Sequence, residues 1–505
     1  MDPIQRRDFL RGLGGSLLAG GAAWSALGGL APLRAQDAKV TPEIVQLRGE
    51  MEAVARWIET TSRDQILSAA VDALRKGLPY RQLLGGLFLA GIRNIKPRPV
   101  GFKFHAVMVI ESAHQLGLDA AQPDRLLPVF WALDNFKASQ EADVREGDWA
   151  LGPVKESAVP SPGEARQRFA EAMEQWDEEA ADAAVAGLYR AAGSSEVAEV
   201  LFRYGARDWQ NIGHKIIFTA HSFRTLHTIG WEHAEPVLRS LVFGLLNGGK
   251  ASATAESAAP YASNLELASS VRKDWMAGKA DPAATTALLG TLRQAKPDEA
   301  AREAALALKN GVSPSSIWDA VSLAAGELLI RQPGIVALHA MTASNSLHYA
   351  YQAASQDSTR LLVLLQACSW LCLFREGVRQ RSGLPEGNRI DQLDADTSAE
   401  PPSLEAVFQD LTKDRALASR RLLAHASRAT SLTPLFDTVR RLVFVKGTDS
   451  HDYKYASALF EEVSKASPAV RPRLVAAAAY QLRGASDRDS PLTEKSRQAL
   501  ARLGS

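Results

Sequence analysis

The sequence predicts an all-α protein, an internally duplicated multi-helix array whose two halves are related by a pseudo-two-fold axis and enclose a central cleft. Alanine, leucine, glutamate and arginine dominate the composition, and alternation of β-branched residues is scarce, which favours helices over sheets. The stretch from Ala73 to His114 occurs a second time, from Ala307 to His348. A chain of 505 residues also exceeds what one ordinary core supports, so two fused halves are expected.

The duplication is an ungapped match between two stretches that start 234 positions apart (307 − 73). Its identical positions include two histidines, so that His105 and His114 correspond to His339 and His348. Because the chain has only 10 histidines, chance explains such a match poorly. Equivalent histidines in two halves indicate one site between the halves.

Helices are expected wherever apolar residues recur at i, i+3 and i+4, and turn-forming residues set their ends. Gly77 ends one helix, two prolines at 96–99 end the next, and Gly230 joins two packed helices within 197–246. Exposed loops are expected at 145–163 and 386–402, a small-residue linker at 248–259, and a tail at 466–505. The other helices are expected at 42–62, 63–76, 78–95, 105–116, 128–140, 164–192, 361–374, 404–425 and 432–445, with one more starting at His451.

The first residues have the features of an export signal. Arg6 and Arg7 begin a twin-arginine pattern, and a weakly apolar run rich in glycine follows at 12–31. The repeated glycines make this run too weak for a stable membrane span. We therefore expect a Tat-type signal peptide at 1–38, recognised by the Tat export machinery, and a protein in the periplasm or otherwise exported. The N-terminal helical half then covers 39–250 and the C-terminal half 251–505, in one composite domain.

Composition argues against several classes of partner. Lys+Arg 58 nearly balances Asp+Glu 57, and no basic stripe with interleaved aromatic residues is present, so nucleic acid is not an expected partner. A GxGxxG fingerprint is absent, which argues against a tightly bound nucleotide. Cys368 and Cys372 lie one helical turn apart, a spacing that would strain a disulfide, so we expect two buried thiols.

Helix geometry selects among the duplicated histidines. Two residues nine positions apart on a helix point in opposite directions, so only one histidine of each pair can face a given site. His105 and His339 each follow a proline by six residues, near the expected start of a helix, where a side chain is easily directed into a cleft. We choose these two. Continuing the duplication places a counterpart of His214 near position 448, within three residues of His451.

Four imidazoles, two from each half, can hold a divalent iron, copper, manganese or zinc ion. Lys454 follows His451 by three residues and shares its face, but a protonated lysine has no lone pair for a metal. Carboxylation by CO₂ would give it oxygen donors; the alternative is an ordinary surface lysine. His221, one heptad after His214, and His348 are candidates for contacts to the ligands or the substrate, and each is otherwise a core histidine.

These residues resemble the questin oxidase family, which comprises all-helical oxygenases of aromatic polyketide metabolism. The sequence departs from the family beside His105, where the family doubles the histidine, and after Lys454, where Tyr455 begins a different segment. The resemblance covers roughly 73–462. Its matching pieces keep the family order: His105 ahead of Leu116 and Gly117, Gly213 and His214 ahead of Ile216 and Ile217, Leu338 to Thr342 around His339, and His451 with Lys454.

The resemblance implies one of two chemistries. In one, a mononuclear non-heme iron, Fe²⁺, held by four histidines and a carboxylated lysine uses O₂ to cleave a carbon–carbon bond. The corresponding ligands are His105, His214, His339, His451 and Lys454. In the other, a metal-free, NADPH-dependent Baeyer-Villiger-type monooxygenase inserts oxygen into a quinone. We expect the first, an exported oxidoreductase acting on a small aromatic or quinone-like molecule. The competing class is a non-enzymatic helical metal-binding or scaffold protein.

Overall fold

The computed structural model describes residues 43–249, 251, 258–398 and 402–502, so the predicted signal peptide lies outside the described residues, as does most of the predicted linker. Within these ranges the protein is all-α, as predicted, and its one extended pairing is an isolated bridge between Lys279 and Val312. The helices are α2 (Glu50–Thr60), α3 (Ile66–Arg75), α4 (Tyr80–Asn94), α5 (His105–Leu118), α6 (Leu127–Arg145), α7 (Ala165–Gln175), α8 (Glu178–Ala191), α9 (Ser194–Gly205), α10 (His214–Ile229), α11 (Ala234–Leu245), α13 (Ala259–Ser269), α14 (Pro282–Leu292), α15 (Pro297–Lys309), α16 (Pro314–Arg331), α17 (Ile335–Ala353), α18 (Asp357–Ser382), α19 (Leu404–Lys413), α20 (Arg415–Arg428), α21 (Thr433–Lys446), α22 (Ser450–Lys465), α23 (Arg471–Ala478) and α24 (Pro491–Ala501).

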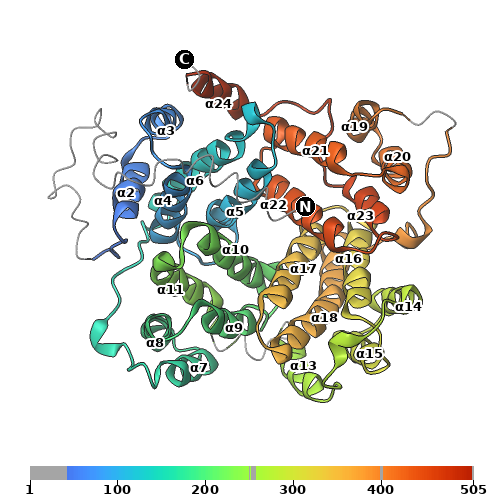
Figure 1. Ribbon diagram of the computed structural model, residues 1–505, viewed down its shortest axis with the longest axis horizontal. Helices are drawn as coiled ribbons and strands as arrows, with labels where there is room; N and C mark the ends of the chain where they lie inside the picture. The colour runs from blue at the N-terminus through green and yellow to red at the C-terminus, as the bar shows by residue number, and fades with distance from the viewer. Residues whose placement is uncertain (1–42, 250, 252–257, 399–401, 503–505) are drawn as a thin grey trace.

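Four helices, α5, α10, α17 and α22, form the centre of the molecule (Figure 1). Each packs against two of the others: α5 against α10 and α22, and α17 against α10 and α22. Helices α4 and α6 cover α5, α9 and α11 cover α10, α16 and α18 cover α17, and α21 and α23 cover α22. Two central helices come from each predicted half, so the centre of the fold is built from both.

The two copies of the duplicated stretch have the same order of elements. In the first copy, α4 ends at Asn94, two prolines interrupt the chain, and α5 begins at His105. In the second copy, α16 ends at Arg331, Pro333 interrupts the chain, and α17 follows. Proline cannot donate the backbone hydrogen bond that a continuing helix needs, which explains both breaks. That a pseudo-two-fold axis relates the halves and that they enclose a cleft stay predictions.

Two ranges that were each predicted as one helix are divided into two helices, because an aspartate inside the range starts a new helix. The range 164–192 is two helices, because Trp176 has a φ of 56° and the Asp177 carboxylate accepts a hydrogen bond from the Ala180 N–H at 3.1 Å. The range 404–425 is divided in the same way by Asp414, which accepts from the Leu417 N–H at 2.9 Å. These aspartates are N-caps, which satisfy amides that a helix start leaves unpaired. The first predicted helix begins only at Glu50.

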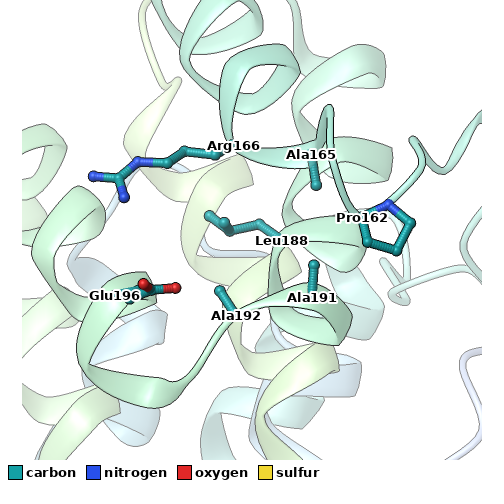
Figure 2. A pocket seen from close by; sticks show the side chains of 7 residues that line it. All are labelled: Pro162, Ala165, Arg166, Leu188, Ala191, Ala192 and Glu196. Atoms are coloured by element: carbon teal, nitrogen blue, oxygen red, sulfur yellow. The ribbon is translucent and has the colours of Figure 1, made fainter.

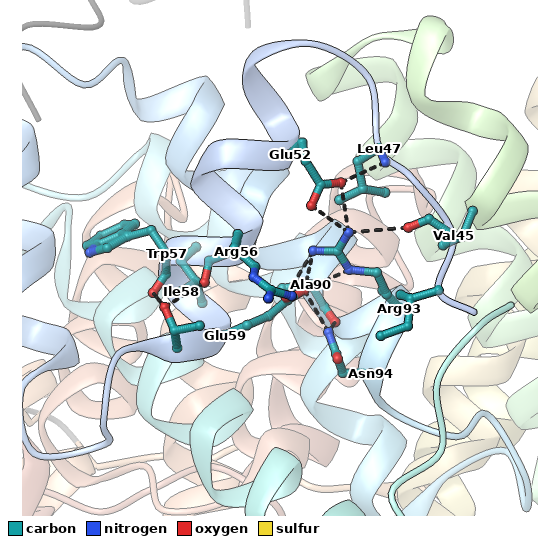
Figure 3. A network of polar contacts seen from close by, with 12 residues as sticks. Val45, Leu47, Glu52, Arg56, Trp57, Ile58, Glu59, Ala90, Arg93 and Asn94 are labelled. Carbon is teal, nitrogen blue, oxygen red and sulfur yellow. Dashed lines mark hydrogen bonds and ion pairs between the residues drawn. The ribbon is translucent and has the colours of Figure 1, made fainter. Parts of the chain in front are cut away.

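Arg93, on α4, connects this helix to α2, the first helix of the described chain. Its side chain is 1% exposed, and its guanidinium forms ion pairs with Glu52 and Glu59 at 2.8 Å each (Figure 3). Its third partner is the Val45 carbonyl, to which it donates at 3.3 Å. A buried guanidinium needs such partners, because an unpaired charge in the interior is strongly destabilising.

Helix α18 is long and apolar enough to cross a membrane by length and composition, and it is also largely buried inside the protein. It packs against α15, α16 and α17. Its two thiols, Cys368 and Cys372, are free and buried, as predicted. Burial raises the pKa of the Cys372 thiol to about 11, so neither the spacing nor the protonation state favours reactivity.

Candidate metal centre

The central helices present one histidine each near their N-terminal ends. His105 and His214 are the first residues of α5 and α10, His451 is the second residue of α22, and His339 is the fifth residue of α17. The start of α22 is fixed by Asp449, whose carboxylate caps the helix in a capping box. Because the four helices start beside one another, their histidines meet.

The four predicted histidines lie together. One nitrogen atom from each of His105, His214, His339 and His451 falls within 4.8 Å of the others. The Nε2 atom of His214 lies 3.0 Å from Nε2 of His339 and 3.3 Å from Nε2 of His105. The His451 ring is centred 4.4 Å from the His105 ring and 5.0 Å from the His339 ring. Nitrogen donors at these separations could hold a metal ion.

Hydrogen bonds at Nδ1 determine which nitrogen of three histidines has a free lone pair. Nδ1 of His214 donates to the Asn211 carbonyl, and Nδ1 of His339 donates to the Ile335 carbonyl at 2.6 Å. A neutral imidazole has only one N–H, so Nε2 of both residues is unprotonated. Two unprotonated nitrogens 3.0 Å apart repel each other unless a cation lies between them. This arrangement fits a bound metal ion.

His451 is oriented in the same way. Its Nδ1 donates to the carboxylate of Asp449, and its Nε2 is buried without a hydrogen-bond partner in the described chain. Although burial opposes ionisation, the bond from His451 lowers the pKa of Asp449 to about 2, so this carboxylate is charged. A carboxylate behind a ligating imidazole is a common arrangement in metal sites, where it fixes the ring and raises its basicity.

Lys454 contacts the fourth histidine. Its Nζ lies 2.7 Å from Nδ1 of His105, and burial lowers the pKa of the lysine from 10.5 to about 7. A protonated Lys454 would donate to Nδ1 and leave the proton of His105 on Nε2, which then could not bind a metal. A neutral Lys454 can accept the Nδ1 proton and leave Nε2 free. Lys454 is thus a buried residue and not the surface lysine of the alternative interpretation. Its role as a metal ligand stays a prediction.

The histidines are neutral at physiological pH. Burial lowers the pKa of each of the four below 6.5, and the pKa of His214 to about 3. Nearby positive charge on Lys454 acts in the same direction on all four. Neutral imidazole is the form that binds metals, so the histidines themselves need no deprotonation before loading, whereas Lys454 has to be neutral for Nε2 of His105 to be free.

Two features of the backbone around the site were not predicted from the sequence. Asn211 and Ile212 both have a left-handed conformation, with φ of 53° and 51°, immediately before Gly213 with φ of 79°. A β-branched residue rarely adopts this conformation, and the turn directs the Asn211 carbonyl at the His214 ring. Gly101 has a φ of 122°, and a Cβ there would lie 3.2 Å from Cε1 of His214. Neither constraint could be inferred from the residue types alone.

The two further predicted histidines lie along the same helices. His221 is buried on α10, and its Nδ1 has no partner in the described chain. His348 is buried on α17, donates from Nδ1 to Glu462 at 2.9 Å and stacks on Trp318 with the ring centres 4.1 Å apart. Neither belongs to the group of four. His348 is held by a carboxylate and an indole, as expected of a core residue.

Two surface pockets carry none of these histidines. The first, of about 100 Å³, lies among α7, α8 and the start of α9, and its charged lining residues are Arg166 and Glu196 (Figure 2). The second, of about 210 Å³, is lined by Trp149 and Phe243 with Glu178, Asp182 and Arg239. Neither pocket is lined by the group of side chains that could hold a metal ion among the described residues.

No protein-family model, curated protein or solved structure matches the chain.

Proposed function

We propose that the protein is a metal-dependent oxygenase, which binds non-heme iron through its four clustered histidines and uses O₂ on a small aromatic or quinone-like substrate. The main support is the 3.0 Å approach of Nε2 of His214 to Nε2 of His339, when both nitrogens carry lone pairs. Imidazole donors suit iron, copper and zinc. A redox metal with an open position would overcome the slow reaction of triplet O₂ with closed-shell organic molecules.

Lys454 has two functions in this proposal. As a neutral amine it accepts the Nδ1 proton of His105, and it can also react with CO₂. In that reaction the Nζ lone pair forms a bond to carbon, one proton leaves to solvent, and a carbamate results. The lowered pKa of Lys454, about 7 because of burial, makes the reactive neutral amine available near neutral pH. The carbamate would add an oxygen donor beside His105.

Metal analysis and O₂ uptake test the proposal. Protein reconstituted with Fe²⁺ under argon is expected to hold one ion per chain and to consume O₂ with small phenols or quinones. His214→Ala should lose the ion because it removes one of four donors. The matched control is His227→Ala, which changes an exposed histidine on the same helix and should keep both metal and activity.

Other outcomes would contradict the proposal in distinct ways. Protein that binds iron in the stated ratio but consumes no O₂ with any of these compounds would be a non-enzymatic metal-binding protein. Metal-free protein that oxidises NADPH in an O₂-dependent manner would be a Baeyer-Villiger-type monooxygenase. Wild-type metal content in His214→Ala would refute the assignment of the ligands.

We also infer that the protein is exported by the Tat machinery, on the strength of the twin-arginine pattern at Arg6 and Arg7 and the weakly apolar run at 12–31. Changing both arginines to lysine should retain the protein in the cytoplasm, as measured by cell fractionation. Unchanged export would contradict this inference.

A further inference from the structure

The histidine cluster lies close to solvent on one side. His214 and His339 are 5% and 0% exposed. His105 and His451 are both partly exposed, and 13% of the His451 side chain reaches solvent. Nε2 of His451 is buried, so solvent meets other atoms of this residue. Among the four histidines, His105 and His451 thus form the side of the cluster that is nearest to the surface.

The segment just before α5 lies between the cluster and solvent. Gly101 packs against the His214 ring, because a Cβ there would lie 3.2 Å from Cε1 and 3.3 Å from Nε2 of that ring. Consecutive Cα atoms are about 3.8 Å apart, so the Cα of Phe102 lies within about 9 Å of the same Nε2. The partly exposed His105 follows three residues later. Phe102 therefore stands at the border of the metal centre.

The side chain of Phe102 is unusual in its exposure. It is 76% exposed, whereas every other phenylalanine, tyrosine and tryptophan among the described residues is buried or half-buried. A single exposed apolar side chain is common on protein surfaces and needs no explanation by itself. At this exposure the ring contributes little to the core, so packing does not account for a phenylalanine at this position.

The backbone of Phe102 is strained as well. Its φ of 47° lies in the left-handed region, which a bulky side chain rarely adopts. The next two residues fix the turn. Lys103 forms ion pairs with Asp143 and Glu146 at 2.7 Å each. Phe104 is fully buried. Strained conformations that their surroundings impose gather at functional sites.

A second strained turn borders the same ring. Asn211 and Ile212 have φ of 53° and 51°, and they precede His214 by three and two residues. The described chain has six non-glycine residues with positive φ, and three of them thus lie within three residues of a clustered histidine. Ile212 is only half-buried, so each of the two turns presents an apolar side chain near solvent.

We propose that Phe102 determines the specificity of the metal site by stacking on the ring of an aromatic substrate whose other end reaches the metal. Two aromatic rings attract each other in offset or edge-to-face arrangements with centres about 4.5–7 Å apart. The short distance from the Phe102 Cα to Nε2 of His214 suits a phenol or quinone of two fused rings. This inference rests on the proposed function, which places the metal among the four histidines.

Calorimetric titration of zinc-loaded protein tests the proposal without turnover, because zinc is redox-inactive. The probes are 2-naphthol and its saturated analogue decahydro-2-naphthol, which both carry one hydroxyl group on two fused rings. Wild-type protein is expected to bind 2-naphthol more tightly. Phe102→Leu keeps an apolar side chain without a ring and should reduce the ratio of the two affinities about two- to tenfold, the usual value of an aromatic pair. Phe102→Tyr keeps the ring and should keep the ratio.

Leu306→Ala is the matched control. Leu306 is 49% exposed on α15, which packs against α13, α14 and α18, and its removal should leave the ratio unchanged. An equal loss in this variant would mean unspecific binding to exposed apolar residues, and would overturn the proposal. An unchanged ratio in Phe102→Leu, or no preference for 2-naphthol in the wild type, would also overturn it. Failure to bind zinc would overturn the metal site itself, and metal analysis of the same samples distinguishes this case.

The melting temperature of metal-free Phe102→Gly checks that the ring has no role in folding. Glycine adopts a positive φ without a steric penalty, so this variant should melt no lower than the wild type while its zinc form loses affinity for 2-naphthol. A lower melting temperature would show that Phe102 stabilises the fold, and would refute a role confined to the substrate.

Discussion

Replacing Lys454 with methionine is expected to stabilise the metal-free protein while abolishing metal-dependent activity. The lysine is 2% exposed, and its hydrogen bond is to the imidazole of His105, not to a carboxylate. Burial lowers its pKa from 10.5 to about 7. The folded protein therefore holds the lysine proton less tightly than the unfolded chain does, which costs folding free energy at neutral pH.

The expected gain follows from the two pKa values. The gap between 10.5 and about 7 corresponds to about 5 kcal/mol at low pH, because each pH unit is worth about 1.4 kcal/mol. The cost is absent above pH 10.5, where both states are neutral, and grows as the pH falls toward 7. At pH 7.5 it is about 4 kcal/mol, and at pH 9.5 about 1.5 kcal/mol. Lys454→Met should recover these amounts.

Urea unfolding of chelator-treated wild-type and variant protein at pH 7.5 and 9.5 measures the gain. The matched control is Lys215→Met, since Lys215 is equally buried but forms an ion pair with buried Asp208 at 2.8 Å. Removing that lysine leaves an unpaired carboxylate and should cost about 3–5 kcal/mol. If Lys454→Met destabilised the protein as Lys215→Met does, or if its gain were equal at both pH values, burial would not lower the pKa of Lys454 in the folded protein.

Three further predictions concern the surroundings of the site. Gly101→Ala should press on the His214 ring and lower metal affinity about 10–100-fold, measured by competition with a chelator, whereas unchanged affinity would show that the contact is not critical. Burial lowers the pKa of His114 from 6.5 to about 4, so the stability it contributes is present above pH 6.5 and is lost as the pH falls toward 4. His114→Gln should therefore reduce the acid loss by about 3 kcal/mol between pH 7.5 and 4, and parallel stability curves for the two proteins would contradict this. Arg93→Met should lower the free energy of unfolding by about 3–5 kcal/mol with metal content unchanged, and a loss of metal would instead connect α2 to the site.

The sequence contained enough to select the four histidines that the structure brings together. The duplication paired His105 with His339, and the helical period separated each from its neighbour nine residues later. In the structure neither neighbour belongs to the histidine cluster. His114 contacts the Tyr80 hydroxyl at 3.1 Å, and His348 contacts Glu462. Periodicity is a strong signal here, since it depends only on chain geometry and not on tertiary packing.

The features that the sequence did not reveal depend on single polar atoms. Asp177 and Asp414 each begin a new helix inside a range that was predicted as one helix, because the carboxylate accepts a hydrogen bond from an amide of the new helix. The left-handed turn at Asn211 and Ile212 is stabilised by its surroundings, since the β-branched Ile212 rarely adopts this conformation. The spacing of Lys454 from His451 left two interpretations open, a carboxylated ligand and a surface lysine, because spacing along a helix does not show whether a side chain is buried. Such outcomes depend on tertiary contacts that local pattern does not encode.

The four histidines differ in how far along the chain the hydrogen-bond partner of the ring lies, and this difference shows what Lys454 contributes to the site. His214, His339 and His451 are held by atoms two to four residues earlier in the chain, so each is oriented as its own helix forms. His105 is held by Lys454, 349 residues later, so its free nitrogen is fixed only when α22 docks against α5. Three donors are thus preset locally and the fourth requires the complete fold. The predicted cost of burying Lys454 therefore accompanies a contact that determines which nitrogen of His105 is free.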